Sequence, residues 1–589
     1  MAARLASRLC ALLALAAAVG CAGPSDPPAG EIRSDAVIGH ARVLAGTIGP
    51  RPADSEPAAR AAAYIEEQLA RAARVERVAV GRVELPPVDV GPFRWLEARV
   101  VEVADQNLVV HFAGTAGGPA ILFMAHYDTV PGSPGAVDNA ASVGILVELA
   151  RALAARPPAH PVVIAFTAAE ERGLAGARAL APRLLASGPP IGLAVSLDMV
   201  GASRTALNGL SPLLGRRWLE WIAARIDESG ADVEVPVPHR VVSRLAPAAE
   251  RSDHGAFTER GVPAFHLYAR GPERIYLPYH TAWDVPERLD AGAIASAGRL
   301  VSALARSRGD LPAAGGDPGF WLPGTGIILS GPAVQGVEAA LGAVTLFLLW
   351  FLWRSGGQRS RGRGVGLIAV ILIVPLLWLL AHLVLVAASG DHPLPWTHVP
   401  AAALVAAILV AAAGAGLAWL SPLGRRRLVG RRRFAAAGAL PLLLAGAGLL
   451  WVGAHELAWM PLAAAVLVAA AALAPGRAAS LVLFALSLAP LVPALSPAFL
   501  RESAFHGFYL RGLPLPFFAG IILAPHAVAA APLLARALPA RASLPRWAAA
   551  VPAALLIAVA AATFVAFRGA PCDAAAFAER GLACEIAPE

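Results

Sequence analysis

The sequence predicts a chain in two parts: an α/β domain with a mostly parallel sheet sandwiched by helices, then an all-α bundle of about eight transmembrane helices. Three observations lead to this prediction. The chain has 589 residues, and 57% of them are hydrophobic, which is too apolar for a purely soluble protein. Short apolar segments alternate with helical segments up to about residue 315. From about residue 336 to residue 567, apolar runs are separated by short loops.

The first 21 residues predict a targeting segment, in which Arg4 and Arg8 precede the apolar run CALLALAAAVG. The end of this segment, Ala-Val-Gly-Cys, resembles a bacterial lipobox, in which small residues precede a cysteine that is lipidated after cleavage. Lipidation of Cys21, ordinary signal cleavage and an uncleaved signal anchor are the three alternatives. All of them carry the following domain out of the cytoplasm, after a linker at residues 22–34.

Residues 35–310 are expected to form the α/β domain. Four segments are short, apolar and β-branched, as buried strands should be: VVHFAG, AILFMAHYD, PVVIAFTAAEE and IGLAVSLDMVG. The stretches 140–156 and 174–187 between them have helical spacing. This alternation predicts a largely parallel sheet covered by helices, with the active site at the carboxyl ends of the strands.

Residue types that bind metals stand at or near those strand ends. They are His126 and Asp128 at the end of one strand, Asp138 at the end of the segment that follows it, Glu170 and Glu171 at the end of another strand, Asp198 at the end of a third, and His280 further downstream. Two zinc ions held by such a set polarise a scissile carbonyl and lower the pKa of a bridging water. The pattern therefore indicates hydrolysis.

Five motifs in order along the chain resemble those of peptidase family M28, a family of zinc peptidases, over about residues 35–310: HYDTVPGSPGAVDNAAS, AAEERGLAGA, SLDMVG, SDHGAF and YHTAWD. The resemblance implies His126 and Asp198 on one zinc ion, Glu171 and His280 on the other, and Asp138 bridging both. It also implies that Glu170 is the general base, that Asp128 supports His126, and that Tyr279 stabilises the oxyanion.

Each of these assignments has a plainer alternative. The alternatives are a structural role for His126, a helix cap at Asp138, a solvated turn at Glu170 and Glu171, and aromatic packing for Tyr279. Asp284 either orients His280 as a carboxylate behind the ligand or caps a turn. Asp253 and His254 in SDHGAF are expected to shape the pocket.

Eight membrane spans are expected, near residues 336–353, 365–388, 400–420, 434–453, 459–475, 478–498, 516–535 and 547–567. The loops after the odd-numbered spans hold fourteen arginines and the intervening loops hold two, which predicts that the arginine-rich loops are cytoplasmic. The α/β domain and the tail at residues 568–589 then lie outside, and residues 311–335 link the two halves. In the tail, Cys572 and Cys584 form a disulfide or remain two thiols.

The net charge of +8 comes mostly from these loop arginines, so it does not indicate nucleic-acid binding. We expect a membrane-anchored dizinc exopeptidase, namely an aminopeptidase that acts on short peptides. The alternatives are a zinc acyltransferase similar to glutaminyl cyclases and a receptor or transporter that retains the peptidase fold without catalysis. The architecture resembles that of membrane-embedded M28 peptidases, and the start of the chain favours the bacterial inner membrane with a periplasmic catalytic domain. The pattern predicts neither the preferred side chain nor the oligomeric state.

Overall fold

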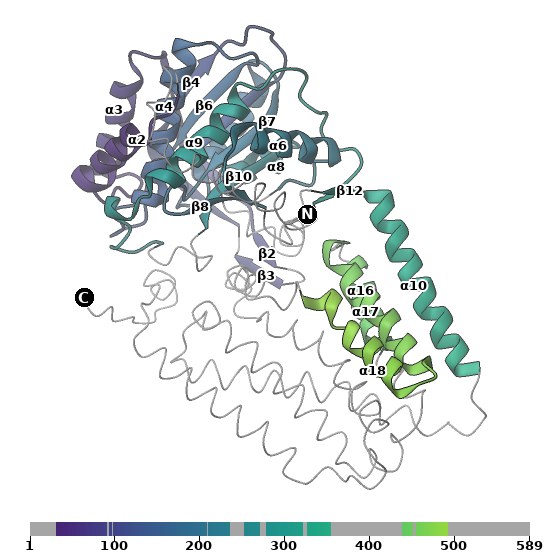
Figure 1. Ribbon diagram of the computed structural model, residues 1–589. Coiled ribbons are helices and arrows are strands. Elements are labelled where there is room, and N and C mark those ends of the chain that lie inside the picture. The colour runs from purple at the N-terminus through teal and green to yellow at the C-terminus, as the bar shows by residue number, and fades with distance from the viewer. Residues whose placement is uncertain are drawn as a thin grey trace, which may run out of the picture.

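The computed structural model describes residues 31–90, 93–96, 98–208, 210–235, 252–270, 279–321, 327–354, 439–451 and 455–492. Within these residues an α/β domain precedes a group of apolar helices (Figure 1). The expected targeting segment, the tail with its two cysteines, and the expected spans at 365–388, 400–420, 516–535 and 547–567 lie outside the described residues.

An eight-stranded mixed sheet forms the centre of the α/β domain, in the order β1-β4-β6-β5-β7-β10-β8-β9. Its strands are β1 (Val75–Leu85), β4 (Arg99–Phe112), β5 (Ala120–His126), β6 (Val162–Thr167), β7 (Ile191–Leu197), β8 (Arg204–Asn208), β9 (Val233–Glu234) and β10 (Ala264–Arg270). The four central strands β6, β5, β7 and β10 run parallel, so their carboxyl ends meet at one edge.

The strands expected from apolar runs are confirmed as β5, β6, β7 and the end of β4. The sheet is less uniformly parallel than expected, because β4 pairs antiparallel with both β1 and β6, and β8 pairs antiparallel with β10. Strand β1 alternates buried and exposed side chains, the pattern of an antiparallel strand with one solvated face, and it has no continuous apolar run.

Helices cover both faces of the sheet (Figure 1). One side carries α2 (Ser34–Ala41), α3 (Glu56–Leu69), α4 (Ala141–Ala155), α6 (Arg216–Ser229) and α9 (Ala291–Ala305). The other side carries α5 (Ala175–Ala186) and the short α8 (His254–Thr258). Three short helical turns, η1 (Arg42–Ile48), η2 (Ala136–Ala140) and η4 (Pro286–Arg288), lie between these elements, and the Asp138–Asn139 peptide bond within η2 is cis.

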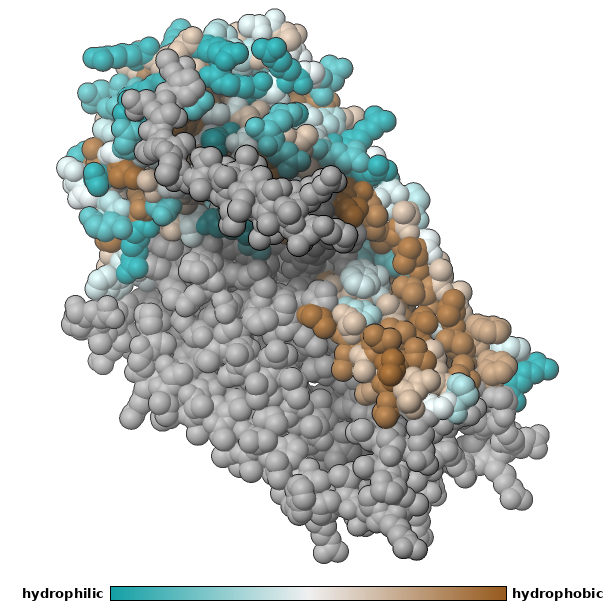
Figure 2. All heavy atoms as spheres, viewed as in Figure 1, coloured by the Kyte–Doolittle hydropathy of each residue, from teal (hydrophilic) through white to brown (hydrophobic). Residues whose placement is uncertain are grey.

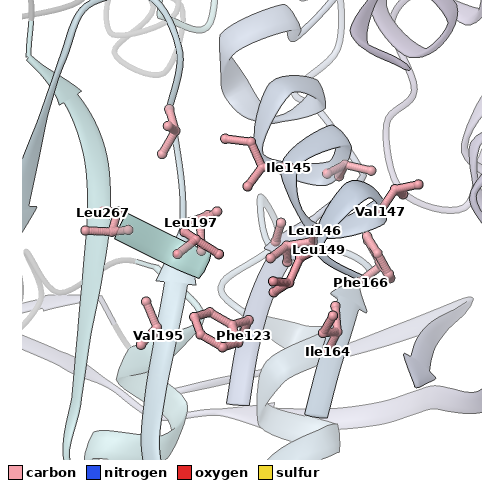
Figure 3. Packing of buried hydrophobic residues seen from close by; sticks show 14 of the residues in the cluster. Phe123, Ile145, Leu146, Val147, Leu149, Ile164, Phe166, Val195, Leu197 and Leu267 are labelled. Carbon is pink, nitrogen blue, oxygen red and sulfur yellow. The ribbon is translucent and has the colours of Figure 1, made fainter. Parts of the chain in front are cut away.

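The core explains why β5 is apolar along its whole length. Ile121 and Phe123 belong to the cluster that includes α4, whereas Leu122 and Met124 belong to the cluster that includes α5 and α8. Figure 3 shows the first cluster, in which side chains of α4 such as Leu149 meet those of the central strands. Because both faces are buried, the end of the strand is held firmly, and it carries His126.

Two small hairpins complete the described strands: β2 (Val88–Val90) with β3 (Phe93–Leu96), and β11 (Gly319–Trp321) with β12 (Ile328–Ser330). Helix α10 (Gly331–Arg354) begins directly after β12 and leads away from the α/β domain (Figure 1). It packs with α17 (His455–Leu473), which also packs with α16 (Ala439–Trp451) and α18 (Arg477–Leu486).

Among the described residues, one helix is long and apolar enough to cross a membrane, over Gly331–Phe351. It matches the first expected span and exposes Phe347, Trp350 and Phe351. Apolar residues dominate the visible surface of α10 and its neighbours, in contrast to the α/β domain (Figure 2).

The expected spans at 434–453, 459–475 and 478–498 correspond to the shorter apolar helices α16, α17 and α18. Helix α18 ends at Leu486, and a 3₁₀ turn, η5 (Ala489–Leu491), follows. Pro490 within that turn lacks the N–H that would continue the helix. The described residues therefore support one span of the expected bundle.

Candidate metal centre

The carboxyl ends of the central strands bring five of the expected residues together. His126 ends β5, Asp198 directly follows β7, and Glu171 lies in the turn after β6. Asp138 comes from η2 at the start of α4, and His280 comes from the segment before η4. Residues separated by up to 154 positions therefore face one another at one edge of the sheet.

Asp138 occupies the middle of this group. Its Oδ1 lies 3.2 Å from Nε2 of His126, and its Oδ2 lies 3.2 Å from Nε2 of His280. Nε2 of His126 also lies 3.6 Å from Asp198 Oδ1, and Nε2 of His280 lies 3.1 Å from Glu171 Oε2. The geometry divides the group into two halves that share the Asp138 carboxylate.

The two imidazole nitrogens have the environment of metal ligands. Nε2 of His126 and Nε2 of His280 are buried, and neither has a hydrogen-bond partner within the described residues, although carboxylate oxygens are close. Ligand atoms of His126, Asp138 and Glu171 all lie within 4.8 Å of one another. Imidazole nitrogen and carboxylate oxygen are donors that zinc accepts, so the residues present fit a zinc centre.

A second layer of hydrogen bonds fixes these side chains. Nδ1 of His126 lies 3.1 Å from the main-chain oxygen of Asp128. The Asp128 carboxylate accepts the main-chain N–H of Glu170 at 3.1 Å and that of Glu171 at 3.2 Å. Asp128 thus joins the end of β5 to the turn after β6, in addition to its expected position behind His126.

Asp284 is directed at the main chain of the Asp138 segment. Its carboxylate accepts the N–H groups of Val137 at 2.8 Å and Asp138 at 3.0 Å. This contact stands beside the two expected alternatives, orientation of His280 and a turn cap, which remain predictions. The contact stabilises the backbone that carries the central carboxylate.

Asn139 is a site residue that sequence reasoning missed. Its side-chain amide donates to the Leu197 carbonyl at 2.8 Å, and its oxygen accepts the Met199 N–H at 3.3 Å. It therefore holds the chain on both sides of Asp198. Its place directly after Asp138 was the only signal that the sequence offered.

The carboxyl group of Glu170 lies in a buried part of the centre, and burial raises its pKa well above the ordinary value. Burial also raises the pKa of Glu171. For His126 and His280, burial by itself lowers the pKa, but Glu170 beside the first and Glu171 beside the second raise it well above the ordinary range. A carboxyl group with a raised pKa near reacting groups suits proton transfer.

The remaining expected residues lie around this centre. The Tyr279 ring stacks on the His280 ring, with centroids 3.7 Å apart. Asp253 is buried and accepts a hydrogen bond from the Thr167 hydroxyl, and burial raises its pKa to about 7. The His254 ring packs against that of His266, with centroids 5.0 Å apart.

Comparison with known proteins shows which family the α/β domain resembles. Residues 107–305 match the model of peptidase family M28. This segment therefore resembles the peptidase domains of family M28. It contains every residue of the centre described above.

Two relatives and one solved structure illustrate the similarity. Aminopeptidase YwaD of Bacillus subtilis is 30% identical over 193 residues, which cover 31% of this chain and 40% of YwaD. A probable zinc metalloprotease of Leptosphaeria maculans is 35% identical over 106 residues, which cover 16% of this chain and 25% of that protein. The structure of BSAP, a zinc aminopeptidase from Bacillus subtilis, aligns with 48% of this chain and 95% of BSAP, with 18% identity and a TM-score of 0.38.

The matched segments span less than half the length of these two relatives. The family match and the relatives support a zinc metallopeptidase, of the hydrolase class.

Proposed function

We propose that this protein is a membrane-anchored dizinc exopeptidase, an aminopeptidase that removes N-terminal residues from short peptides. One observation carries the proposal: the two carboxylate oxygens of Asp138 each lie 3.2 Å from Nε2 of a different histidine. A carboxylate between two ligand sets is the arrangement that a two-metal site needs.

The charges of the group agree with two zinc ions. His126 and Asp198 would hold one ion, Glu171 and His280 would hold the other, and Asp138 would bridge them. Three carboxylates and two neutral imidazoles offset three of the four positive charges. The remaining positive charge is what keeps a bound water acidic.

When bound, the zinc ions would polarise the scissile carbonyl and acidify the attacking water. Glu170 would accept the proton of that water and pass it to the leaving amine. Its burial and its raised pKa support this role, because a carboxyl group with an ordinary pKa would hold the proton too weakly to return it near neutral pH. The hydroxyl of Tyr279 would donate to the oxyanion.

The proposal extends to the membrane. We propose the domain boundaries and the eight spans expected from the sequence, with the M28 domain on the exoplasmic side of a bacterial inner membrane. Helix α10 supports this placement, since it is apolar over Gly331–Phe351 and begins directly after the β11–β12 hairpin, close to the end of the α/β domain. An exoplasmic position also agrees with the arginine-rich loops after the odd-numbered spans.

The test uses the full chain, purified in detergent and assayed on aminoacyl anilides with and without a chelator. Glu170→Gln keeps the shape of the side chain and removes its basic oxygen, so we expect kcat to fall by about 10²- to 10⁴-fold. Glu148→Gln is the matched control, because Glu148 is also buried but pairs with His40 on α2. Zinc content is measured for all three proteins.

The outcomes distinguish the candidate functions. Loss of cleavage in Glu170→Gln with two zinc ions still bound supports the aminopeptidase. Release of pyroglutamyl products from glutaminyl peptides, without anilide cleavage, would instead show a cyclase. A folded wild-type protein that holds zinc and turns over neither substrate would show a binding protein.

A further inference from the structure

Arg51 is a fully buried arginine beside the metal centre. Its side chain donates to the carbonyl oxygens of Tyr127 at 2.7 Å, Pro134 at 2.5 Å and Gly135 at 3.0 Å. It also contacts the carbonyl oxygens of Leu44 and Gly49 at 3.4 Å and 3.3 Å. In the part of the chain that the structure describes, every hydrogen bond of the guanidinium goes to a main-chain oxygen.

Three of these carbonyls, those of Tyr127, Pro134 and Gly135, belong to the loop between two proposed ligands. Tyr127 directly follows His126, and Gly135 comes three residues before Asp138. The main chain of Arg51 adds two contacts to the same loop: its N–H donates to the Thr129 hydroxyl at 3.0 Å, and its carbonyl accepts the Thr129 N–H at 3.3 Å. A single side chain therefore joins both ends of the loop.

A guanidinium suits this position better than an ammonium. It is planar, it always carries its charge, and it presents five N–H donors in a rigid fork. A buried charge is costly unless other groups compensate it. Here the compensation comes from carbonyl dipoles and from the nearby charges of Asp284, Asp128 and Asp138.

We infer that Arg51 is a positioning residue that sets the separation between His126 and Asp138 and thereby tunes metal affinity at the centre. This inference rests on the proposed function, because it needs His126 and Asp138 to be ligands. Arg51 touches none of the proposed ligand side chains by a hydrogen bond within the described residues, so its effect passes through the main chain.

The test is a Co²⁺ titration of chelator-treated full-length protein, followed by visible absorption. Arg51→Lys keeps the charge and removes the fork, so we expect at least one Co²⁺ to bind about 10-fold or more weakly, with a changed spectrum. We also expect kcat to fall while KM stays near the wild-type value, because the substrate does not touch Arg51. Thermal unfolding of the metal-free proteins reports stability separately.

Arg306→Lys is the matched control. Arg306 donates to the carbonyls of Arg156 and Ala152, at the end of α4 remote from the centre. This variant should lose stability and keep the wild-type Co²⁺ affinity and spectrum. If Arg51→Lys behaves in the same way as Arg306→Lys, Arg51 is only structural and the inference is overturned.

Thr129→Val provides a second, nearly isosteric test if Arg51→Lys does not fold. It removes the hydroxyl acceptor of the Arg51 N–H, and we expect Co²⁺ to bind about 3-fold more weakly. Unchanged affinity in this variant would also overturn the inference. A wild-type protein that binds neither Co²⁺ nor Zn²⁺ would overturn both the inference and the proposed function, whereas metal binding equal in wild type and variants overturns the inference alone.

Discussion

Asp128→Asn perturbs the hydrogen bonds that hold the turn with Glu170 and Glu171, and it also changes the carboxylate that lies 3.6 Å from Nδ1 of His126. The buried carboxylate accepts the main-chain N–H of both residues, at 3.1 Å and 3.2 Å. Asparagine has nearly the same shape but offers one oxygen and one NH₂ group. Whichever way the amide is turned, one of the two N–H groups loses its acceptor and faces another donor.

The size of the expected fall in activity follows from the number of hydrogen bonds lost and the usual strength of such a bond. A hydrogen bond to a charged acceptor contributes about 1.5 to 3 kcal/mol, and one such bond is lost. Since about 1.4 kcal/mol corresponds to a factor of ten in rate, we expect kcat/KM on an aminoacyl anilide to fall about 10- to 100-fold. The fall should appear in kcat/KM because the bonds align the proposed general base with its neighbour at the metal.

Asp290→Asn is the control for the loss of a carboxylate that accepts a main-chain N–H. Asp290 caps α9 by accepting the Ala293 N–H at 2.6 Å, and within the described residues its carboxylate makes no hydrogen bond to a residue of the metal centre. It should lower the melting temperature slightly and leave kcat/KM unchanged. The prediction is wrong if Asp128→Asn retains kcat/KM within about 2-fold of wild type and melts at the same temperature. The two hydrogen bonds would then contribute neither to the position of Glu170 and Glu171 nor to the stability of the domain.

Three further predictions follow from the same structure. Chelation should abolish anilide cleavage and zinc should restore it, with two equivalents bound by elemental analysis; restoration by a single equivalent would contradict the bridging role of Asp138. Phe123→Ala should destabilise the domain by about 3 to 5 kcal/mol in urea unfolding, because the ring is fully buried under α4, while zinc stoichiometry stays unchanged. Gly176→Ala should lower the melting temperature severely, since its Cβ would lie 2.2 Å from the Ala168 carbonyl oxygen and 2.5 Å from Asn107 Oδ1. A melting temperature equal to that of wild type would show that β6 and α5 shift more easily than their packing indicates.

The parallel centre of the sheet was predictable because its strands are buried on both faces. Strands β5, β6 and β7 therefore read as predominantly apolar runs, and a polar residue of the centre ends each run or follows it within three positions. Strand β1 was not predicted because its alternating exposure removes the apolar run. The helices α4 and α5 were predicted within two residues of their ends.

The contacts behind the proposed ligands were harder to predict, because they join positions far apart in the chain. Asp284 accepts N–H groups 146 and 147 positions earlier, and Arg51 reaches a carbonyl 84 positions later. Such contacts go to main-chain atoms, which carry no signature in the sequence. Residue type alone could predict which side chains are suitable metal ligands. It could not predict which side chains, such as those of Asp284 and Arg51, hold the main chain around the ligands in place.

The connection between the α/β domain and the apolar helices shows how the two parts of the chain are coupled. Helix α10 begins at Gly331, directly after β12, and the Gly331 N–H donates to the Asp317 carboxylate at 3.0 Å. A Cβ at Gly331 would lie 2.6 Å from the Pro318 side chain, so the junction is closely packed.

Contacts further along α10 extend this packing into the next helices. Glu338 on α10 bonds to His455 on α17 at 2.9 Å, and the ring of Phe320 on β11 meets that of His455 edge to face, with centroids 5.6 Å apart. The β11–β12 hairpin, α10 and α17 are therefore linked by side-chain contacts within the described residues. If α10 crosses the membrane as proposed, these contacts connect the β11–β12 hairpin, which follows the α/β domain in the chain, directly to the membrane-spanning helix.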